Sequence, residues 1–237
     1  MSEYPKVLLG IVTYDGKAYI DKEFFNNLKN LSYPNVDVFV VDNSVNKKYY
    51  NNLKRRGLDV KHINRGQNSR EAQAKSLEVI RKKALKENYD YFMSIESDLL
   101  PPVDIIERLM SYNKQVVGSM YLIGYANSKT QIPRPCLFAV RNKKGGKGVE
   151  TYNIPADDGW NFFGHGVVKV HGCGLGATLI HRSVLEKVRF WYYMSTVVKH
   201  SDVLFYADLA NLGIDIFVDT DILLPHFNSD WNKVADA

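Results

Sequence analysis

Strand-like and helix-like segments alternate through residues 1–100, and this alternation restricts the fold more than any other feature of the chain. Apolar runs with strand composition occupy residues 6–13, 36–41, 60–63 and 91–95. Three helical patterns separate them. The first covers residues 21–31, the second ends near Gly57, and the third runs from Asn68 or Ser69 to about Asn88. Strands that alternate with helices form βαβ units, so we expect an α/β fold with a mostly parallel sheet flanked by helices.

Each of these strands is followed by a polar loop. The loops are Tyr14-Asp15-Gly16, Asp42-Asn43-Ser44, Asn64-Arg65-Gly66 and Glu96-Ser97-Asp98. Parallel strands present their carboxyl ends at one edge of the sheet, and open α/β sheets bind their ligands outside those ends. We therefore expect the loops to lie together and form a ligand crevice.

The carboxylates of Glu96 and Asp98 are two residues apart, just past a buried strand and before Pro101-Pro102. Hard cations such as Mg²⁺ and Mn²⁺ are bound by one or two carboxylates together with phosphate oxygens of a substrate. The pair therefore suggests a metal-bridged diphosphate. The alternative is a polar turn in which Asp98 or a neighbour caps a helix that begins near Val103.

The second half of the sequence is less regular. Strand-like runs cover residues 116–121, 136–140 and 214–218, and a helical pattern over residues 201–212 stops at Gly213. Residues 141–148 are basic and Gly-rich, which is typical of a solvated hairpin tip, and residues 157–166 have the composition of a loop. Since no repeat or linker divides the chain, we expect one domain over residues 1–237.

Composition excludes some classes of protein and leaves others open. With 237 residues, 45% of them hydrophobic and 24% charged, the chain can bury a full core. Cys136 and Cys173 do not make a disulfide framework, so a reducing compartment is expected. We see neither a signal-peptide pattern nor an apolar run of the ~18 residues that cross a membrane, and so expect a cytoplasmic protein. A net charge of +5 and a pI of about 9.0 favour anionic ligands, acidic lipid headgroups at a membrane surface or nucleic acid, and do not choose among them.

The order of the motifs resembles that of the GT-A glycosyltransferases, in particular family 2 of the nucleotide-sugar-dependent transferases. Each motif is common by itself, and their joint order and spacing make the resemblance specific over residues 6–227. The segments that carry it are residues 7–15, residues 40–44, Asn64-Arg65-Gly66 with Arg70, Glu96-Ser97-Asp98 in the place of Asp-x-Asp, residues 174–182, Ser201-Asp202 and Leu224-Pro225-His226.

The resemblance implies a nucleotide-binding half at residues 1–100 and a smaller acceptor-binding half at residues 101–237. The implied nucleotide-sugar contacts are Thr13, Tyr14, Asp15, Asp42, Asn43, Arg65, Arg70, Glu96 and Ser97. The implied metal ligands are Glu96, Asp98 and His226, and the expected acceptor contacts are Trp160, Gly174 and Leu175. An imidazole ligand favours Mn²⁺ over Mg²⁺ as the cofactor.

The resemblance also implies the reaction. Asp202 would be the general base that takes the acceptor hydroxyl proton in an inverting transfer. A UDP-sugar is the expected donor, the acceptor is a glycan, a lipid-linked molecule or a protein, and nucleic acid is not an expected partner. Two residues depart from the family pattern: Glu96 replaces an Asp, and Ser201 replaces a Glu next to Asp202.

The plainer interpretations of the same residues remain open. Asp202 can cap the helix that it begins, His226 can be a loop histidine, and Asp42 can belong to a turn. Trp160 can pack in the core rather than stack on a sugar.

Two other functions compete with sugar transfer. Nucleotidyl transfer to a sugar phosphate usually needs a Gly-rich phosphate loop after the first strand, and residues 10–16 do not form one. A non-catalytic module that binds nucleic acid or a glycan would have no use for the acidic residues and His226 together.

Overall fold

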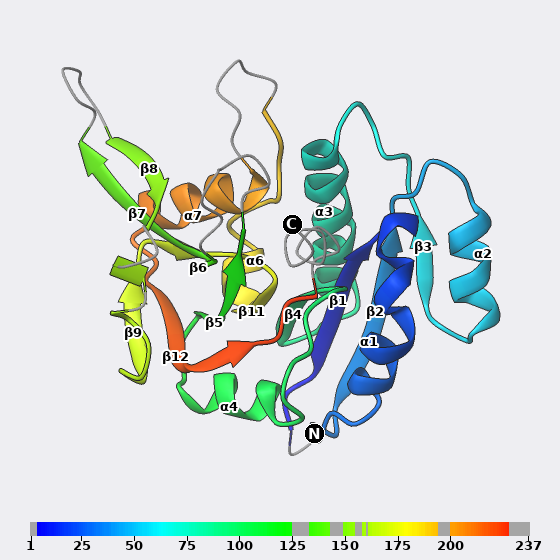
Figure 1. Ribbon diagram of the computed structural model, residues 1–237, viewed down its shortest axis with the longest axis horizontal. Helices are drawn as coiled ribbons and strands as arrows, with labels where there is room; N and C mark the ends of the chain where they lie inside the picture. The colour runs from blue at the N-terminus through cyan, green and yellow to red at the C-terminus, as the bar shows by residue number, and fades with distance from the viewer. Residues whose placement is uncertain are drawn as a thin grey trace, which may run out of the picture.

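A computed structural model describes residues 4–124, 133–142, 149–154, 158–159, 161–193 and 200–227. Within those ranges the central feature is a nine-stranded sheet in the order β3-β2-β1-β4-β11-β5-β12-β9, with β6 paired to β5 (Figure 1). Its first half is built from β1 (Val7–Thr13), η1 (Asp15–Ile20), α1 (Asp21–Leu28), β2 (Val36–Asp42), α2 (Lys48–Arg55), β3 (Val60–His62), α3 (Ser69–Lys86) and β4 (Tyr91–Glu96). The predicted α/β class with a mostly parallel sheet flanked by helices is confirmed.

The strands β3, β2, β1 and β4 are parallel neighbours and form the core of this half. Leu8, Leu9 and Ile11 of β1 have no exposed surface, as expected for a strand that helices cover on both faces. At Gly10 a side chain would collide with Ile80 of α3 and Phe92 of β4. The glycine therefore lets α3 pack directly on the centre of the sheet.

The chain changes direction across the sheet at β1. From β1 it proceeds to β2 and β3 on one side, and α3 then carries it back to β4 on the other side of β1. The carboxyl ends of β1 and β4 therefore flank a topological switch point, where open α/β sheets leave a crevice for a ligand. The register sets Val12 of β1 beside Glu96 of β4, so that the loops after both strands begin at the same level.

The second half extends the same sheet. Its elements are α4 (Ile105–Ser111), β5 (Val116–Ile123), β6 (Arg134–Pro135), β7 (Leu137–Asn142), β8 (Val149–Asn153), β9 (Val167–Val170), β10 (Gly172–Cys173), β11 (Ala177–His181), α6 (Arg182–Leu185), α7 (Ser201–Asn211) and β12 (Ile216–Leu224). Strand β11 runs antiparallel to both β4 and β5, whereas β12 is parallel to β5. The carboxyl ends of β5 and β12 consequently lie at the same edge as those of β1 and β4.

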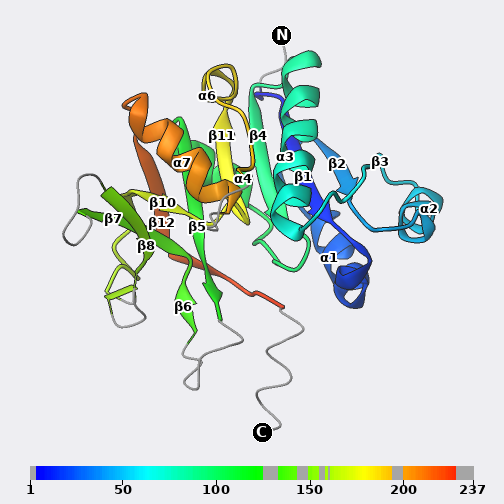
Figure 2. The same ribbon diagram turned by 90° about the horizontal axis from the view of Figure 1, so that it is seen from above.

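Helices cover the sheet on both sides. Figure 2 shows α1 and α3 on opposite faces of β1 and β2, and α3 also contacts α6 and α7. A separate three-stranded sheet in the order β10-β7-β8 lies beside α7, and its β7–β8 hairpin projects away from α1 and α2 (Figure 1).

Several boundaries differ from the sequence-based predictions. The long helix is capped by Asn68 as predicted, because its side chain accepts hydrogen bonds from the backbone of Arg70 and Glu71. The helix predicted near Val103 begins at Ile105, and the last strand extends to Leu224 rather than ending at 218. Most of the basic hairpin tip lies outside the described residues. The division into a nucleotide-binding and an acceptor-binding half stays a prediction.

No helix in the described ranges is both long enough and apolar enough to cross a membrane.

Candidate active site

A pocket of about 220 Å³ opens at the switch point between β1 and β4. The carboxyl ends of these two strands and the first turns of α3 form its walls. The residues that line it are Val12, Thr13, Tyr14, Lys17, Asn43, Arg65, Ser69, Arg70, Gln73, Glu96, Ser97, Asp98 and His200. Most of the predicted nucleotide-sugar contacts are therefore brought together around one cavity.

The acidic side of this pocket is completed by a residue from the other end of the sequence. After β12 the chain docks against the loop that follows β4, through a bridge between Leu99 and His226 and a hydrogen bond of 2.8 Å from the Phe227 amide to the Asp98 carbonyl. This backbone pairing sets the His226 ring beside the Asp98 carboxylate. One ligand atom from each of Glu96, Asp98 and His226 lies within 4.8 Å of the others.

The orientation of His226 turns one of its ring nitrogens toward the Asp98 carboxylate. Its Nδ1 lies 2.6 Å from the Leu122 carbonyl oxygen, which can only accept, so Nδ1 carries the proton of the neutral ring. The Nε2 lone pair then faces Asp98 Oδ2 at 3.2 Å. Two acceptors at this distance need a positive charge between them, either a proton on Nε2 or a metal ion. A backbone acceptor on the second nitrogen is the usual arrangement for a metal-binding histidine.

The charges around Asp98 and His226 point in the same direction. Burial acts to lower the pKa of His226, but the hydrogen bond and charge of Asp98 outweigh it and raise the pKa. Burial, and next the negative charge of Asp98, raise the pKa of Glu96. Both shifts show that the negative charge of Asp98 favours added positive charge at this site.

The donor set fits a divalent cation. Asp98 has no exposed surface, and its Oδ1 has no hydrogen-bond partner among the described residues. A buried carboxylate oxygen without a partner is costly, and such an orphan in a native fold calls for an explanation. Two carboxylates and an imidazole are a set that Mn²⁺ accepts readily. The alternative interpretation of Asp98 as a helix cap is wrong, since α4 begins seven residues later, at Ile105, with Asp104 as its N-cap.

Lys17 is a site residue that the sequence interpretation missed. It lies in η1, directly after β1, and its ammonium forms a short ion pair with Asp98 Oδ2 across the pocket. Burial opposes the charge, but Asp98 and next Glu96 raise the pKa of Lys17, so that it stays protonated. The sequence did contain a signal for Lys17: it is a cationic residue four positions after the end of the first strand, at a switch point.

The opposite wall of the pocket carries positive charge. Arg70 lies in the first turn of α3, and its Nε is buried without a hydrogen-bond partner among the described residues. The Arg65 guanidinium stacks on the Tyr14 ring, 4.6 Å from its centroid, and donates to Asn43 Oδ1 at 3.1 Å. A helix N-terminus with an unpaired guanidinium nitrogen is suited to a phosphate group.

Two predicted nucleotide contacts lie elsewhere. Asp42 has no exposed surface, and its carboxylate accepts from the Ser44 amide at 3.0 Å and is paired with His62 Nδ1 at 2.7 Å. Asp15 is exposed, and its backbone amide donates to Ser44 Oγ. Neither is among the described residues that line the pocket. Their contact with a nucleotide stays a prediction.

The predicted base, Asp202, lies in the first turn of α7. Its Oδ1 accepts a hydrogen bond of 2.7 Å from the Val203 amide, and the α7 N-cap is His200. Burial, assisted by the charge of Glu96, raises the pKa of Asp202 to about 7. Its neighbours connect it to the pocket: His200 lines the cavity, and Ser201 Oγ lies 3.4 Å from Gln73 Oε1.

The predicted acceptor contacts are only partly described. Gly174 and Leu175 are buried, and any side chain at Gly174 would collide with the Tyr121 hydroxyl. The Tyr121 ring in turn packs edge-on against His226, with 5.4 Å between ring centroids. Gly174 therefore supports the wall behind His226. Trp160 lies outside the described residues, and acceptor contact for all three stays a prediction.

Solved structures identify the architecture. No protein-family model and no curated protein matches the sequence. The 1–349 fragment of TarS from S. aureus, in complex with UDP-GlcNAc, matches with a TM-score of 0.58 and 16% identity over 92% of this chain and 57% of that one. The mannosyltransferase PcManGT from Pyrobaculum calidifontis, in complex with GDP-Man and Mn²⁺, matches with a TM-score of 0.59 and 15% identity over 94% of this chain and 57% of that one. The chain has the GT-A fold.

At these identities the likeness establishes the fold, and the resemblance inferred from the sequence is confirmed at that level. This chain spans 57% of the length of each of these two matched chains.

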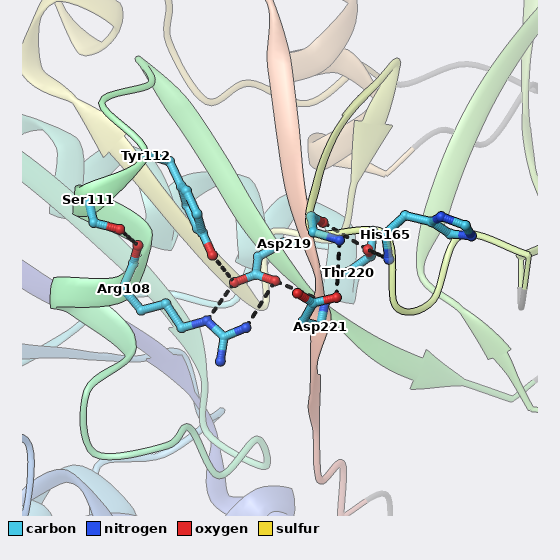
Figure 3. A network of polar contacts seen from close by, with 8 residues as sticks. Arg108, Ser111, Tyr112, His165, Asp219, Thr220 and Asp221 are labelled. Atoms are coloured by element: carbon cyan, nitrogen blue, oxygen red, sulfur yellow. Dashed lines mark hydrogen bonds and ion pairs between the residues drawn. The ribbon is translucent and has the colours of Figure 1, made fainter.

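In this GT-A fold a buried polar network anchors the strand that leads to His226 (Figure 3). The register of β12 on β5 shifts between Asp219 and Leu223. Just before the shift, Asp219 Oδ2 accepts from Arg108 Nε at 2.7 Å and from the Tyr112 hydroxyl at 2.6 Å. Asp219 Oδ1 accepts from the Asp221 amide at 2.9 Å. The network therefore fixes the irregular backbone that carries the chain to His226.

We expect Asp219→Asn to destabilise the protein by about 1–3 kcal/mol, because it leaves Arg108 without its buried carboxylate. The melting temperature should fall by about 2–10 °C. Asp221→Asn is the matched control: Asp221 is exposed, and an asparagine keeps the Oδ1 that accepts from the Gly166 amide. Equal melting temperatures for the two variants would show that the network does not stabilise β12.

Proposed function

We propose that this protein is a metal-dependent, inverting glycosyltransferase that moves a sugar from a nucleotide-sugar to a hydroxyl acceptor. One observation carries the proposal. At the GT-A switch point, Glu96, Asp98 and His226 form a cluster that could hold a metal ion. This cluster faces the pocket wall that carries Arg70 and the α3 N-terminus. The two sides suit a diphosphate held between a metal ion and a guanidinium.

The residues would divide the work as follows. Asp98 and His226 would hold the ion directly, and Glu96 would bind it or an attached water. When bound, the ion neutralises charge that develops on the leaving diphosphate. Arg70 would pair with phosphate oxygens on the opposite side. Thr13, Tyr14 and Asn43, at the ends of β1 and β2, would hold the nucleoside.

Asp202 would act as the general base. The acceptor oxygen attacks the anomeric carbon, the bond from that carbon to the diphosphate oxygen breaks, and the hydroxyl proton passes to the Asp202 carboxylate. A single displacement of this kind inverts the anomeric centre. A carboxylate with a pKa of about 7 is well matched to proton transfer near neutral pH.

The donor and the metal are proposed at the level of class. The similar structures were solved with UDP-GlcNAc in one case and with GDP-Man and Mn²⁺ in the other, so the fold accommodates either base. We propose a UDP-sugar from the sequence resemblance and Mn²⁺ from the imidazole ligand. The same proposal includes an acceptor that is a glycan, a lipid-linked molecule or a protein. It also includes a cytoplasmic location and contact with a membrane surface.

A thermal-shift titration with UDP and GDP, each with and without Mn²⁺, tests the donor site. A nucleotide at about 100 times its Kd should add roughly 2.7 kcal/mol, which raises the melting temperature by about 5–10 °C for a chain of this size. We expect a shift that needs both the metal and one of the two nucleotides. That nucleotide's sugar conjugates are then tested for hydrolysis or transfer by release of the diphosphate.

No shift with either nucleotide would remove the proposed donor site. DNA affinity with a steep dependence on salt would then support a nucleic-acid-binding module on the same fold.

A further inference from the structure

One carboxylate oxygen of Asp98 contacts both His226 and Lys17. Asp98 Oδ2 lies 3.2 Å from His226 Nε2 and also forms an ion pair with the Lys17 ammonium. Lys17 and His226 come from opposite ends of the sequence. A metal ion bound between Asp98 Oδ2 and His226 Nε2 would need the oxygen that Lys17 contacts.

We propose that Lys17 is a built-in cation that holds divalent metal off the empty site and couples metal binding to nucleotide binding. In the absence of a nucleotide, the ammonium neutralises Asp98. When a diphosphate enters, the ammonium moves onto a phosphate oxygen and leaves Asp98 to the metal. The second step rests on the proposed function, whereas the first does not.

Competition at Asp98 follows from charge and burial. Asp98 has no exposed surface, so a monovalent and a divalent cation close to it repel each other with little screening by water. A metal ion between Asp98 Oδ2 and His226 Nε2 shares that oxygen with the ammonium, and a metal ion on the unpartnered Oδ1 still lies close to the same positive charge. Metal must therefore displace Lys17 or bind with the repulsion unrelieved, and in either case its affinity for the empty site is reduced.

Lys17 is able to change partners. Its side chain is 26% exposed and lines the pocket whose far wall carries Arg70. A lysine has a flexible four-carbon stem and three donors, and an ammonium binds phosphate as a point charge without a fixed approach. A diphosphate in the pocket therefore offers Lys17 a new counter-ion within the same cavity.

The coupling has a thermodynamic consequence. If a nucleotide relieves the competition, it must raise metal affinity by the same factor by which metal raises nucleotide affinity. The arrangement would make the protein bind metal mainly together with its donor.

Mn²⁺ binding measured by the electron paramagnetic resonance signal of the free ion tests both steps, with UDP and GDP as probes. The variant is Lys17→Met, which removes the charge and keeps a similar length. Lys22→Met, at an exposed position on α1, is the matched control, and Lys17→Arg retains the charge. Circular dichroism and melting curves establish that each variant is folded.

Without nucleotide, Lys17→Met should bind Mn²⁺ about tenfold more tightly than wild type, whereas Lys22→Met and Lys17→Arg should stay close to wild type. The factor by which nucleotide raises Mn²⁺ affinity should fall towards 1 in Lys17→Met. Equal or weaker Mn²⁺ binding by Lys17→Met in the absence of nucleotide would overturn the proposal, because it would place the metal away from the oxygen that Lys17 contacts. The proposal would also be overturned if nucleotide raised the Mn²⁺ affinity of Lys17→Met by the same factor as that of wild type.

The two proposals fail separately. Tighter Mn²⁺ binding by nucleotide-free Lys17→Met, together with no sugar transfer by wild type, would support the role of Lys17 and reject the glycosyltransferase. Sugar transfer by wild type with no effect of Lys17 on Mn²⁺ affinity would do the reverse.

Discussion

Replacing Asp202 by asparagine should lower the rate of sugar transfer about 10²–10⁴-fold and leave nucleotide affinity unchanged. The substitution keeps the Oδ1 atom that accepts the Val203 amide, so the start of α7 is preserved. It removes only the ability of the side chain to take a proton. Turnover and nucleotide Kd, measured on the same preparations, check the two halves of this expectation.

The same substitution should stabilise the metal-free protein above neutral pH. Burial raises the pKa of Asp202 from an ordinary 3.8 to about 7, so the folded state holds this proton more tightly than the unfolded chain does. Asp202 makes its full contribution to the stability of the fold below pH about 4. This contribution is lost as the pH rises through about 7, and the loss is at most about 4 kcal/mol. An asparagine has no charge to bury and avoids that loss.

The melting temperatures of wild type and Asp202→Asn should therefore separate as pH rises. We expect similar values near pH 4 and an excess of about 3–10 °C for the variant at pH 8. Asp208→Asn is the control on the same helix, because Asp208 accepts from Trp191 Nε1 at 2.7 Å, away from the pocket. Near-normal transfer by Asp202→Asn would reject the base assignment, and a lower melting temperature at pH 8 would reject the buried charge.

The sequence predicted what depends on local pattern. The apolar runs of β1, β2 and β4 are buried on both faces, so they stand out from the polar loops that follow them. Once those strands are parallel, their loops must share an edge, and Tyr14, Asn43 and Glu96 do meet in one pocket. The long helix was recognisable because Asn68 is a good cap.

What the sequence did not predict depends on tertiary contacts. Lys17 is one charged residue in a polar loop until β1 and β4 become neighbours and bring it to Asp98. The pairing of Asp42 with His62 also depends on the adjacent strand β3, which lies twenty residues further along the chain. The extension of β12 to Leu224 rests on the shift held by Asp219 and Arg108, more than a hundred residues apart. No window of local sequence contains these pairs.

Asp98→Asn should weaken Mn²⁺ binding by roughly 100-fold or more, since loss of an outer-shell partner alone typically costs 10–100-fold. The amide retains the size of the carboxylate but not its charge, and the metal-dependent shift with nucleotide should disappear. Asp104→Asn, at an exposed position at the start of α4, is the control and should bind Mn²⁺ like wild type.

The pH dependence of the metal-free protein gives an independent measure of the same contact. Asp98 raises the pKa of His226, so the charged pair stabilises the fold below pH about 6.5 and this contribution is lost as pH rises through the folded pKa. Asp98→Asn should lack that decline, and the His226 ring should titrate at lower pH by nuclear magnetic resonance. An unchanged His226 titration would mean that Asp98 and His226 do not form the contact on which the metal site depends.

Combining the substitutions separates the metal ligand from its competitor. If the competition for Asp98 accounts for most of the effect of Lys17, Lys17→Met should have little effect on Mn²⁺ affinity once Asp98 is an asparagine. In the wild-type background the same change should tighten Mn²⁺ binding. If instead Lys17→Met tightens binding equally in both backgrounds, Lys17 repels the metal through its general charge, and the metal does not use the oxygen that Lys17 contacts.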